Sequence, residues 1–207
     1  MPTESRPLFV VLDGIDGCGK STQADRLAER IGRETGQRVH HLREPGSTRL
    51  GEALRSLVLG RGFAPTASVE TLLFAAARAQ MLFELVAPAL ARGEHVVCER
   101  FHPSTFAYQA VAGRLPEADV LALLQRWAGD PRPSHVLLLE LPAEVAAVRR
   151  GQATDRIEDR GVAFQREVAR GFARYAALVP GVARIDAARS PEVVAQDVWW
   201  EVARALH

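Results

Sequence analysis

The residues with the clearest capacity for chemistry lie in one short stretch near the N-terminus. Positions 14–21 read G-x-x-x-x-G-K-S, with an apolar run before them and a helix-compatible run after them. Glycines permit positive φ angles and let backbone N–H groups approach a polyphosphate closely. A helix that starts here adds unpaired N–H donors and a partial positive charge. We therefore predict a phosphate-binding loop that comprises Gly14, Ile15, Asp16, Gly17, Cys18, Gly19, Lys20, Ser21 and Thr22.

Two residues of this loop have specific chemical tasks. Lys20 would reach the β- and γ-phosphates of a bound nucleotide, and the Ser21 hydroxyl would ligate Mg²⁺. Lysine and arginine together number 26, and Lys20 is the only lysine among them. Because an ammonium and a guanidinium group are not interchangeable, the single lysine indicates a place where a compact point charge is needed.

The lysine count also excludes one class of nucleotide-binding protein. Guanine-nucleotide switches read the base with a lysine in an [N/T]-K-x-D segment, and this sequence has no second lysine to supply it. Motors and ATPases usually carry further domains, whereas 207 residues suit one domain with a sizeable core. We therefore expect a small-molecule kinase that folds as a single domain over 1–207.

The composition is that of an ordinary globular chain. Hydrophobic residues make up 47% and charged residues 25%, and the formal net charge is +1. With so little excess charge, we expect no binding to nucleic acid or to an anionic membrane. Arg78 and Glu84 interrupt the most apolar stretch, so no membrane-spanning helix is expected. Cys18 and Cys98 match no metal-binding or disulfide pattern, so the expected location is a reducing cytoplasm.

Five apolar runs alternate with helical patterns along the chain. This alternation predicts an α/β fold of the phosphate-loop NTPase type, with a five-stranded parallel sheet and helices on both faces. Ligands of such sheets bind beyond the carboxyl ends of the strands. The predicted strands are 8–12, 37–42, 94–98, 135–141 and 182–186. The predicted helices are 21–35, 47–57, 66–92 with Pro88 kinking it or ending it early, one from Pro103, 117–127, one from Pro142, 162–178 and 191–206.

A kinase whose acceptor is itself a phosphate needs a second group of cations. The acceptor oxygen is already deprotonated at neutral pH, so catalysis depends on positioning and charge neutralisation. Arg43, Arg78 and Arg100 follow or flank the second predicted strand, the long helix and the third predicted strand. We predict that these three arginines hold the acceptor phosphate.

Several segments together resemble a known family. GIDGCGKST (14–22), REPGST (43–48), LLFAAARAQ (72–80) and ERFHPSTFAYQ (99–109) occur in order, and TDRIE (154–158) follows them. On these motifs the chain resembles the bacterial thymidylate kinases, phosphate-loop nucleoside monophosphate kinases that convert dTMP to dTDP with ATP and Mg²⁺. The resemblance implies a five-stranded parallel core, a homodimer packed through helices, and a short lid at about 150–160 that closes over ATP.

The resemblance also implies a dTMP site built from several segments. Phe74 would stack on the thymine ring, and Arg78 and Thr105 would hydrogen-bond the edge of the base. Tyr108 would lie near the sugar C2′ and favour a deoxyribose. The whole implied set, in which Arg43 and Arg100 hold the phosphate and Pro45 shapes the base pocket, is Asp13, Arg43, Pro45, Phe74, Arg78, Glu99, Arg100, Ser104, Thr105, Tyr108 and Gln109.

For the donor, the resemblance implies that Arg149 lies against adenine and that Ser21 and Asp16 act with Mg²⁺. The loop has no arginine between Asp16 and Lys20, so charge on the transferring phosphoryl group would be neutralised by the lid. The implied catalytic set is Lys20, Asp16, Arg100, Arg150 and Arg156.

The sequence departs from the family pattern in a few places. Glu99 stands where an aspartate is usual, Phe101 replaces an aromatic hydroxyl, and the lid after Arg149 is a few residues short. These changes leave two alternatives open. One is a kinase for another nucleoside monophosphate or a nucleoside, and the other is a weakly active nucleotide-binding regulatory protein. A panel of acceptors separates the alternatives.

Overall fold

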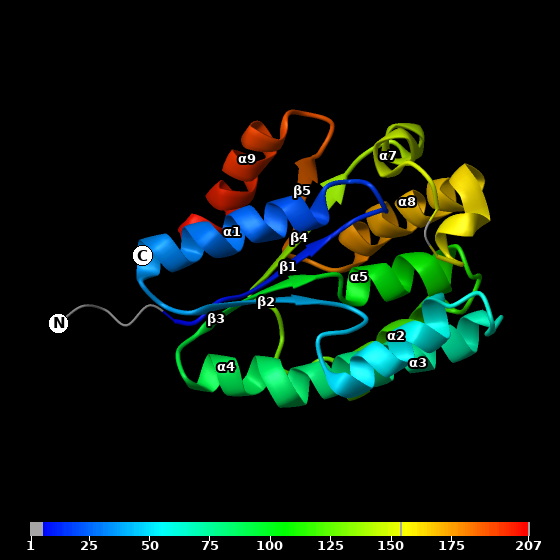
Figure 1. Ribbon diagram of the computed structural model, residues 1–207, viewed down its shortest axis with the longest axis horizontal. Coiled ribbons are helices and arrows are strands. Elements are labelled where there is room, and N and C mark those ends of the chain that lie inside the picture. The colour runs from blue at the N-terminus through cyan, green and yellow to red at the C-terminus, as the bar shows by residue number, and fades with distance from the viewer. Residues whose placement is uncertain (1–5, 154, 207) are drawn as a thin grey trace.

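A five-stranded, all-parallel sheet runs through the centre of the chain (Figure 1). The computed structural model describes residues 6–153 and 155–206. The strand order is β2-β3-β1-β4-β5, which confirms the predicted fold class. The strands are β1 (Phe9–Asp13), β2 (Val39–Arg43), β3 (His95–Glu99), β4 (His135–Glu140) and β5 (Val182–Asp186).

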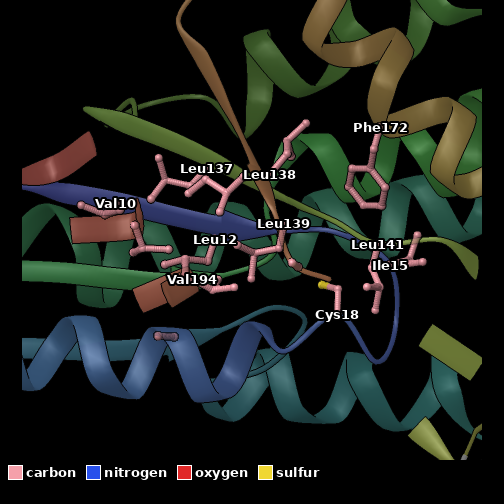
Figure 2. Packing of buried hydrophobic residues seen from close by; sticks show 14 of the residues in the cluster. Val10, Leu12, Ile15, Cys18, Leu137, Leu138, Leu139, Leu141, Phe172 and Val194 are labelled. Atoms are coloured by element: carbon pink, nitrogen blue, oxygen red, sulfur yellow. The ribbon is translucent and has the colours of Figure 1, made fainter. Parts of the chain in front are cut away.

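The central strand β1 is buried along its whole length because helices cover both faces of the sheet. Val10 and Leu12 pack on the side of α1 (Lys20–Thr35) and α9 (Pro191–Ala203), next to Val194 (Figure 2). Phe9 and Val11 point the other way, toward the long helix that precedes β3. A strand alternates its side chains between two faces, so a continuous apolar run is what a strand covered on both faces requires.

The long helix continues through Pro88, which corrects one sequence expectation. It consists of α3 (Ala67–Met81), a π-helical stretch η1 (Leu82–Val86) and α4 (Ala87–Ala91). Proline cannot donate the i→i−4 hydrogen bond, and its ring crowds the preceding turn. The π-helical turn widens the helix just before Pro88, and the N–H of Ala87 donates to the carbonyl of Leu82 instead. The helix therefore neither ends nor breaks at the proline.

The same helix bears on the expectation about membranes. Ala67–Ala91 is long and apolar enough to cross a bilayer by length and composition, and it is the single helix of this kind in the described ranges. The expectation that Arg78 and Glu84 rule out such a helix was therefore too strong. The core helices of soluble proteins can also be this long and apolar. In Ala67–Ala91, 39% of the most apolar window is buried inside the protein. Arg78 itself is buried in an ion pair with Glu44.

The remaining helices agree with the predicted pattern to within a few residues. Thr48 caps α2 by accepting a hydrogen bond from the N–H of Gly51, and Gly36 ends α1 in a left-handed conformation. Pro142 lies one position before α7 rather than at its first residue. The elements are α2 (Arg49–Leu59), α5 (His102–Thr105), η2 (Phe106–Val111), α6 (Glu117–Trp127), α7 (Ala143–Arg150), η3 (Glu158–Arg160) and α8 (Gly161–Leu178).

Candidate active site

The predicted phosphate loop connects β1 to α1, the strand–turn–helix setting that such a loop needs. Gly14, Gly17 and Gly19 have φ angles of 147°, 87° and 96°. A Cβ on Gly17 would lie 2.3 Å from the carbonyl oxygen of Ala146, and one on Gly14 would lie 2.5 Å from that of Leu139. Both conformation and space therefore demand glycine in the loop.

Side chains of the loop point in two directions. Ile15 and Cys18 pack into the core beside β4 (Figure 2), and burial raises the pKa of the Cys18 thiol. Lys20 is 8% exposed, and its Nζ donates to the carbonyls of Gly14 at 3.0 Å and Ile15 at 2.8 Å. Ile15 and Cys18 can therefore meet a ligand only through their backbone, whereas the Lys20 ammonium is held against the loop itself.

A cavity in front of the loop, here called the loop cavity, is lined by cationic side chains from five parts of the chain. Ser21 donates to Glu99 Oε2 at 2.6 Å, and His41 Nε2 lies 2.9 Å from Glu99 Oε1. Burial raises the pKa of Glu99, but the bonds from His41 and Ser21 outweigh it and lower that pKa. The lining residues are Asp16, Gly17, Gly19, Lys20, Ser21, Thr22, Arg43, Glu44, Arg55, Glu99, Arg100, Arg149 and Glu158.

A second cavity, here called the inner cavity, adjoins the first and is lined by two aromatic rings together with charged and polar side chains. It contains every residue of the predicted dTMP set except Asp13, Arg43 and Glu99. Pro45 follows a cis peptide bond and is buried. The lining residues are Asp16, Glu44, Pro45, Arg55, Leu59, Phe74, Arg78, Arg100, Ser104, Thr105, Tyr108, Gln109, Asp155, Ile157 and Glu158.

The two cavities share an ion pair between Arg100 and Asp16. Arg100 also donates to Ser104 Oγ at 3.0 Å, and the Tyr108 hydroxyl donates to Asp16 at 2.8 Å. Burial raises the pKa of Asp16, but Arg100 and Lys20 outweigh it and lower that pKa to about 2. Burial likewise opposes the charge on Arg100, and Asp16 outweighs it, so the pKa of Arg100 lies well above its usual range. Both groups are therefore ionised at neutral pH.

A buried pair, Arg78 and Glu44, forms one wall of the inner cavity. Arg78 is 1% exposed, its Nε donates to Glu44 Oε2 at 2.6 Å, and its Nη2 donates to Thr105 Oγ1 at 3.1 Å. Burial raises the pKa of Glu44 to about 7, and Arg78 opposes that rise. Arg78 Nη1 is buried with no hydrogen-bond partner among residues 6–153 and 155–206.

Asp13 does not line either cavity, so its predicted contact with dTMP needs correction. Its side chain is 0% exposed, and its two oxygens accept bonds from the N–H groups of Gly14, Phe101 and Ser104 and from the Ser104 hydroxyl. With all four bonds made inside the protein, Asp13 ties the end of β1 to the segment after β3. It acts on the site through Ser104 rather than by touching a ligand.

Arg156 is likewise not brought to the phosphate loop. Its guanidinium donates to the Val58 carbonyl at 2.9 Å and to Glu70 Oε1 at 2.6 Å, so these contacts do not support its predicted catalytic role. Arg150 is the last residue of α7 and lies close to Gly17, and its charge helps to lower the pKa of Asp16. Thr154, part of the TDRIE segment and of the predicted lid, lies outside the described residues.

Three further predicted residues line the loop cavity, and one of them, Asp16, also lines the inner cavity. Glu99 and Arg43 were assigned to dTMP, yet neither lines the inner cavity. Asp16 was assigned to the metal, but its oxygens accept from Arg100, Tyr108 and Gln165. The carboxylate in direct contact with Ser21 is that of Glu99, not of Asp16.

The sequence interpretation missed Arg55, which lines both cavities. Its Nη1 donates to the Pro45 carbonyl at 2.9 Å, and burial followed by the nearby Arg43 lowers its pKa. Nothing in the local sequence distinguishes Arg55 from an arginine on the solvent face of α2. Only the packing of α2 against α3 turns it inward.

Comparisons with known proteins agree with this geometry. The family model for thymidylate kinase matches residues 12–198. The chain is 42% identical over 193 residues to a protein of Synechococcus sp. (strain JA-3-3Ab) named thymidylate kinase, covering 93% of each chain. Proteins of the same name from Verminephrobacter eiseniae and Desulforudis audaxviator are 43% and 41% identical, with 94% and 96% of this chain and 90% and 91% of theirs covered.

A phosphate loop that opens onto two joined cavities, each lined by arginine side chains, is the geometry expected of a phosphate-loop kinase with a phosphorylated acceptor. The family match and the relatives narrow this class further. The chain belongs to the thymidylate kinase family, ATP-dependent enzymes that phosphorylate dTMP to dTDP. Nothing in the comparisons favours another acceptor or a regulatory protein.

Proposed function

We propose that this protein transfers the γ-phosphoryl group of ATP to dTMP, giving dTDP and ADP. A dTMP phosphate oxygen would form the new bond to the γ-phosphorus while the bond to the β–γ bridging oxygen breaks, and that oxygen leaves with ADP. The observation that carries the proposal is the junction of the two cavities at Asp16, Arg55 and Arg100. A donor held at the loop and an acceptor in the inner cavity would meet there, with cations around both phosphates.

The lining of the inner cavity supports recognition of thymine and a deoxyribose. Phe74 and Pro45 offer apolar surface for the base, and the unpartnered Nη1 of Arg78 offers a donor for its edge. Tyr108 is fixed by its bond to Asp16, which supports its proposed place beside the sugar C2′. We assign the acceptor phosphate to Arg100 and Arg55.

We propose that the backbone of the phosphate loop and Lys20 hold the β- and γ-phosphates of ATP. Arg149 donates to the carbonyls of Ala187 and Ala188, so its guanidinium plane is already fixed where the loop cavity opens. This supports its proposed contact with adenine. The Cβ of Arg150 lies beside Gly17, and this position supports a role in neutralising the transferring phosphoryl group.

The donor set near Ser21 fits a magnesium ion bound together with nucleotide phosphates. Mg²⁺ prefers oxygen ligands, keeps several waters and is commonly held by one or two protein groups plus phosphates. The Ser21 hydroxyl and the Glu99 carboxylate, 2.6 Å apart, supply such oxygens. When bound, the ion would draw charge from the phosphate oxygens. Lys20 and Arg100 keep the reacting groups aligned, and no protein base is needed.

We propose that the protein is a homodimer that pairs through α2 and α3. The side chains of Leu72 and Val69 on α3 and of Phe83 on η1 are 56%, 44% and 77% exposed, and Leu50 and Leu57 on α2 are also exposed. Exposed apolar side chains grouped on neighbouring helices are typical of an interaction surface. Sedimentation of Leu72→Glu against the unchanged protein tests this, because a charge at the interface should yield monomers.

We also propose that the enzyme acts in the cytoplasm, on small nucleotides and without nucleic acid or membrane partners. Cys18 and Cys98 are both free and buried, which suits a reducing compartment. The near-neutral net charge of +1 supports the absence of a polyanionic partner.

The test is a coupled ADP-release assay with dTMP, dUMP, dCMP, dGMP and AMP. Preference for dTMP is expected, and equal rates with all five acceptors would reject the substrate assignment. Arg55→Ala should raise the KM for dTMP about tenfold or more, because a charge-assisted contact to the phosphate is lost. Arg49→Ala is the matched control, since Arg49 is an exposed arginine on the same helix. It should leave KM unchanged.

A further inference from the structure

A buried carboxylate, that of Glu70, lies directly behind the inner cavity. Glu70 is on α3, one helical turn before Phe74, and is 2% exposed. Gln109 Nε2 donates to its Oε2 at 2.9 Å, and Arg156 Nη2 donates to its Oε1 at 2.6 Å. Both oxygens are thereby fixed by groups from η2 and from the segment that precedes η3.

These contacts determine which way the Gln109 amide points. An ionised carboxylate only accepts hydrogen bonds, so the NH₂ group of Gln109 must face Glu70 and its oxygen must face away. Gln109 lines the inner cavity and is 1% exposed. Its Oε1 is buried without a partner in the part of the chain that the structure describes. A buried acceptor without a partner is costly, so this oxygen is suited to receive an N–H from a ligand.

The inner cavity thus presents one unpartnered donor, Arg78 Nη1, and one unpartnered acceptor, Gln109 Oε1. Thymine and uracil carry an acceptor oxygen at position 4 and an N–H at position 3, so both groups are complemented. Cytosine carries an amino donor at position 4 and a bare nitrogen at position 3, so both contacts would fail.

We propose that Glu70 is a positioning residue that sets acceptor selectivity by holding the Gln109 amide with its oxygen toward the base. The proposal rests on the function proposed above. Glu70 never touches the nucleotide; it acts through Gln109. Arg156 binds the other carboxylate oxygen, Oε1, and leaves Oε2 to Gln109.

Glu70→Gln tests the proposal because it keeps the shape of the side chain but removes its acceptor-only character. The new amide can face Gln109 with nitrogen or oxygen, so Gln109 can turn over. The ratio of kcat/KM for dTMP to that for dCMP should fall about tenfold, the size of one hydrogen bond, mainly through a higher KM for dTMP. The kcat/KM for dUMP should fall by the same factor as that for dTMP, because its base edge is the same. Glu70→Asp should keep most of the selectivity.

Arg156→Gln is the matched control, because it removes the other partner of the carboxylate while the bond to Gln109 remains. It should change kcat/KM for dTMP and dCMP by the same factor. Gln109→Ala should lower this ratio about tenfold, to the level that Arg78 alone supports, and adding Glu70→Gln to it should change the ratio no further. An equal loss with both acceptors in Glu70→Gln, or an effect that adds to that of Gln109→Ala, would overturn the proposal.

A measurement on the unchanged protein covers the case in which Glu70→Gln fails to fold. The side-chain NH₂ resonances of Gln109 should exchange slowly with solvent, with and without dTMP, because one proton is bound to Glu70. Exchange at the rate of a free amide would overturn the proposal. A protein that shows no dTMP activity at all contradicts the proposed function instead, so the two failures can be told apart.

Discussion

Replacing Glu44 by Gln should change how the stability of the protein depends on pH. Glu44 is 5% exposed, and burial, opposed by Arg78, raises its pKa from 4.5 to about 7. Between these two values the folded protein holds a proton that the unfolded chain has released. The free energy of unfolding therefore falls as pH rises through this window. The stabilisation that the raised pKa of Glu44 provides is fully present only below about pH 4.5. Gln has no proton to lose, so the variant lacks this fall.

The magnitude follows from the size of the shift. A difference of about 2.5 units between 4.5 and 7, at about 1.4 kcal/mol per unit, corresponds to roughly 3 kcal/mol. The free energy of unfolding of Glu44→Gln, minus that of the unchanged protein, should therefore rise by about 3 kcal/mol between pH 4.5 and pH 8. The amide oxygen that Glu44→Gln introduces can still accept from Arg78, so the wall of the inner cavity should persist.

Urea unfolding at fixed protein concentration, repeated from pH 4.5 to pH 8, measures this difference. Glu52→Gln is a suitable control, because Glu52 is exposed and the N–H of Ser47 lowers its pKa. Its contribution to stability is present above its unfolded pKa and is lost on acidification, so its difference curve should have the opposite sign. A flat curve for Glu44→Gln would refute the reasoning, since it would mean that Arg78 keeps the buried carboxyl ionised throughout.

Three further outcomes test the site and the fold. Lys20→Ala should lower kcat by about two to three orders of magnitude in the ADP-release assay, because a preorganised charge at the transferring phosphate is lost; its circular dichroism spectrum should match that of the unchanged protein. Phe74→Ala should raise the KM for dTMP about tenfold to a hundredfold, since base stacking on an aromatic ring contributes about 1–3 kcal/mol; an unchanged KM would move the base elsewhere. Gly171→Val should lower the Tm by several degrees, because a Cβ at Gly171 lies 2.6 Å from the Cα of Ala107, where α8 packs on η2; an unchanged Tm would contradict this close packing.

The local sequence was sufficient to predict the parallel sheet, the positions of most helices and the phosphate loop. A strand buried on both faces must be apolar throughout, and β1 is. A loop that packs as closely as Gly17 does against Ala146 must be glycine. Right-handed crossovers restrict how alternating strands and helices can pair, and the strand order itself is seen only in the structure. These features depend on neighbours in the chain or on rules that hold for all such sheets.

Pro88 marks the limit of local rules within one helix. The sequence indicates that a proline interrupts the hydrogen-bond ladder, but it does not say how the helix responds. Packing of Leu82, Val86 and Ala89 against the sheet holds the helix on both sides of the proline, so a π-helical turn accommodates the missing hydrogen bond. The tertiary contacts therefore preserve a helix that the local rule would end.

The roles of individual polar residues were decided by the tertiary structure. Asp13 and Asp16 are three residues apart. Asp13 accepts hydrogen bonds inside the protein only, whereas Asp16 lies where the two cavities join. Arg55 and Glu70 have no local feature that separates them from ordinary helix residues. Glu70 meets Gln109 across 39 positions, and Arg100 meets Asp16 across 84. The sequence by itself determined that a phosphate loop exists and that it lies at the carboxyl edge of a parallel sheet. Which carboxylates and guanidinium groups remain available to a nucleotide depends on desolvation and pairing between distant segments, and only the folded chain sets these.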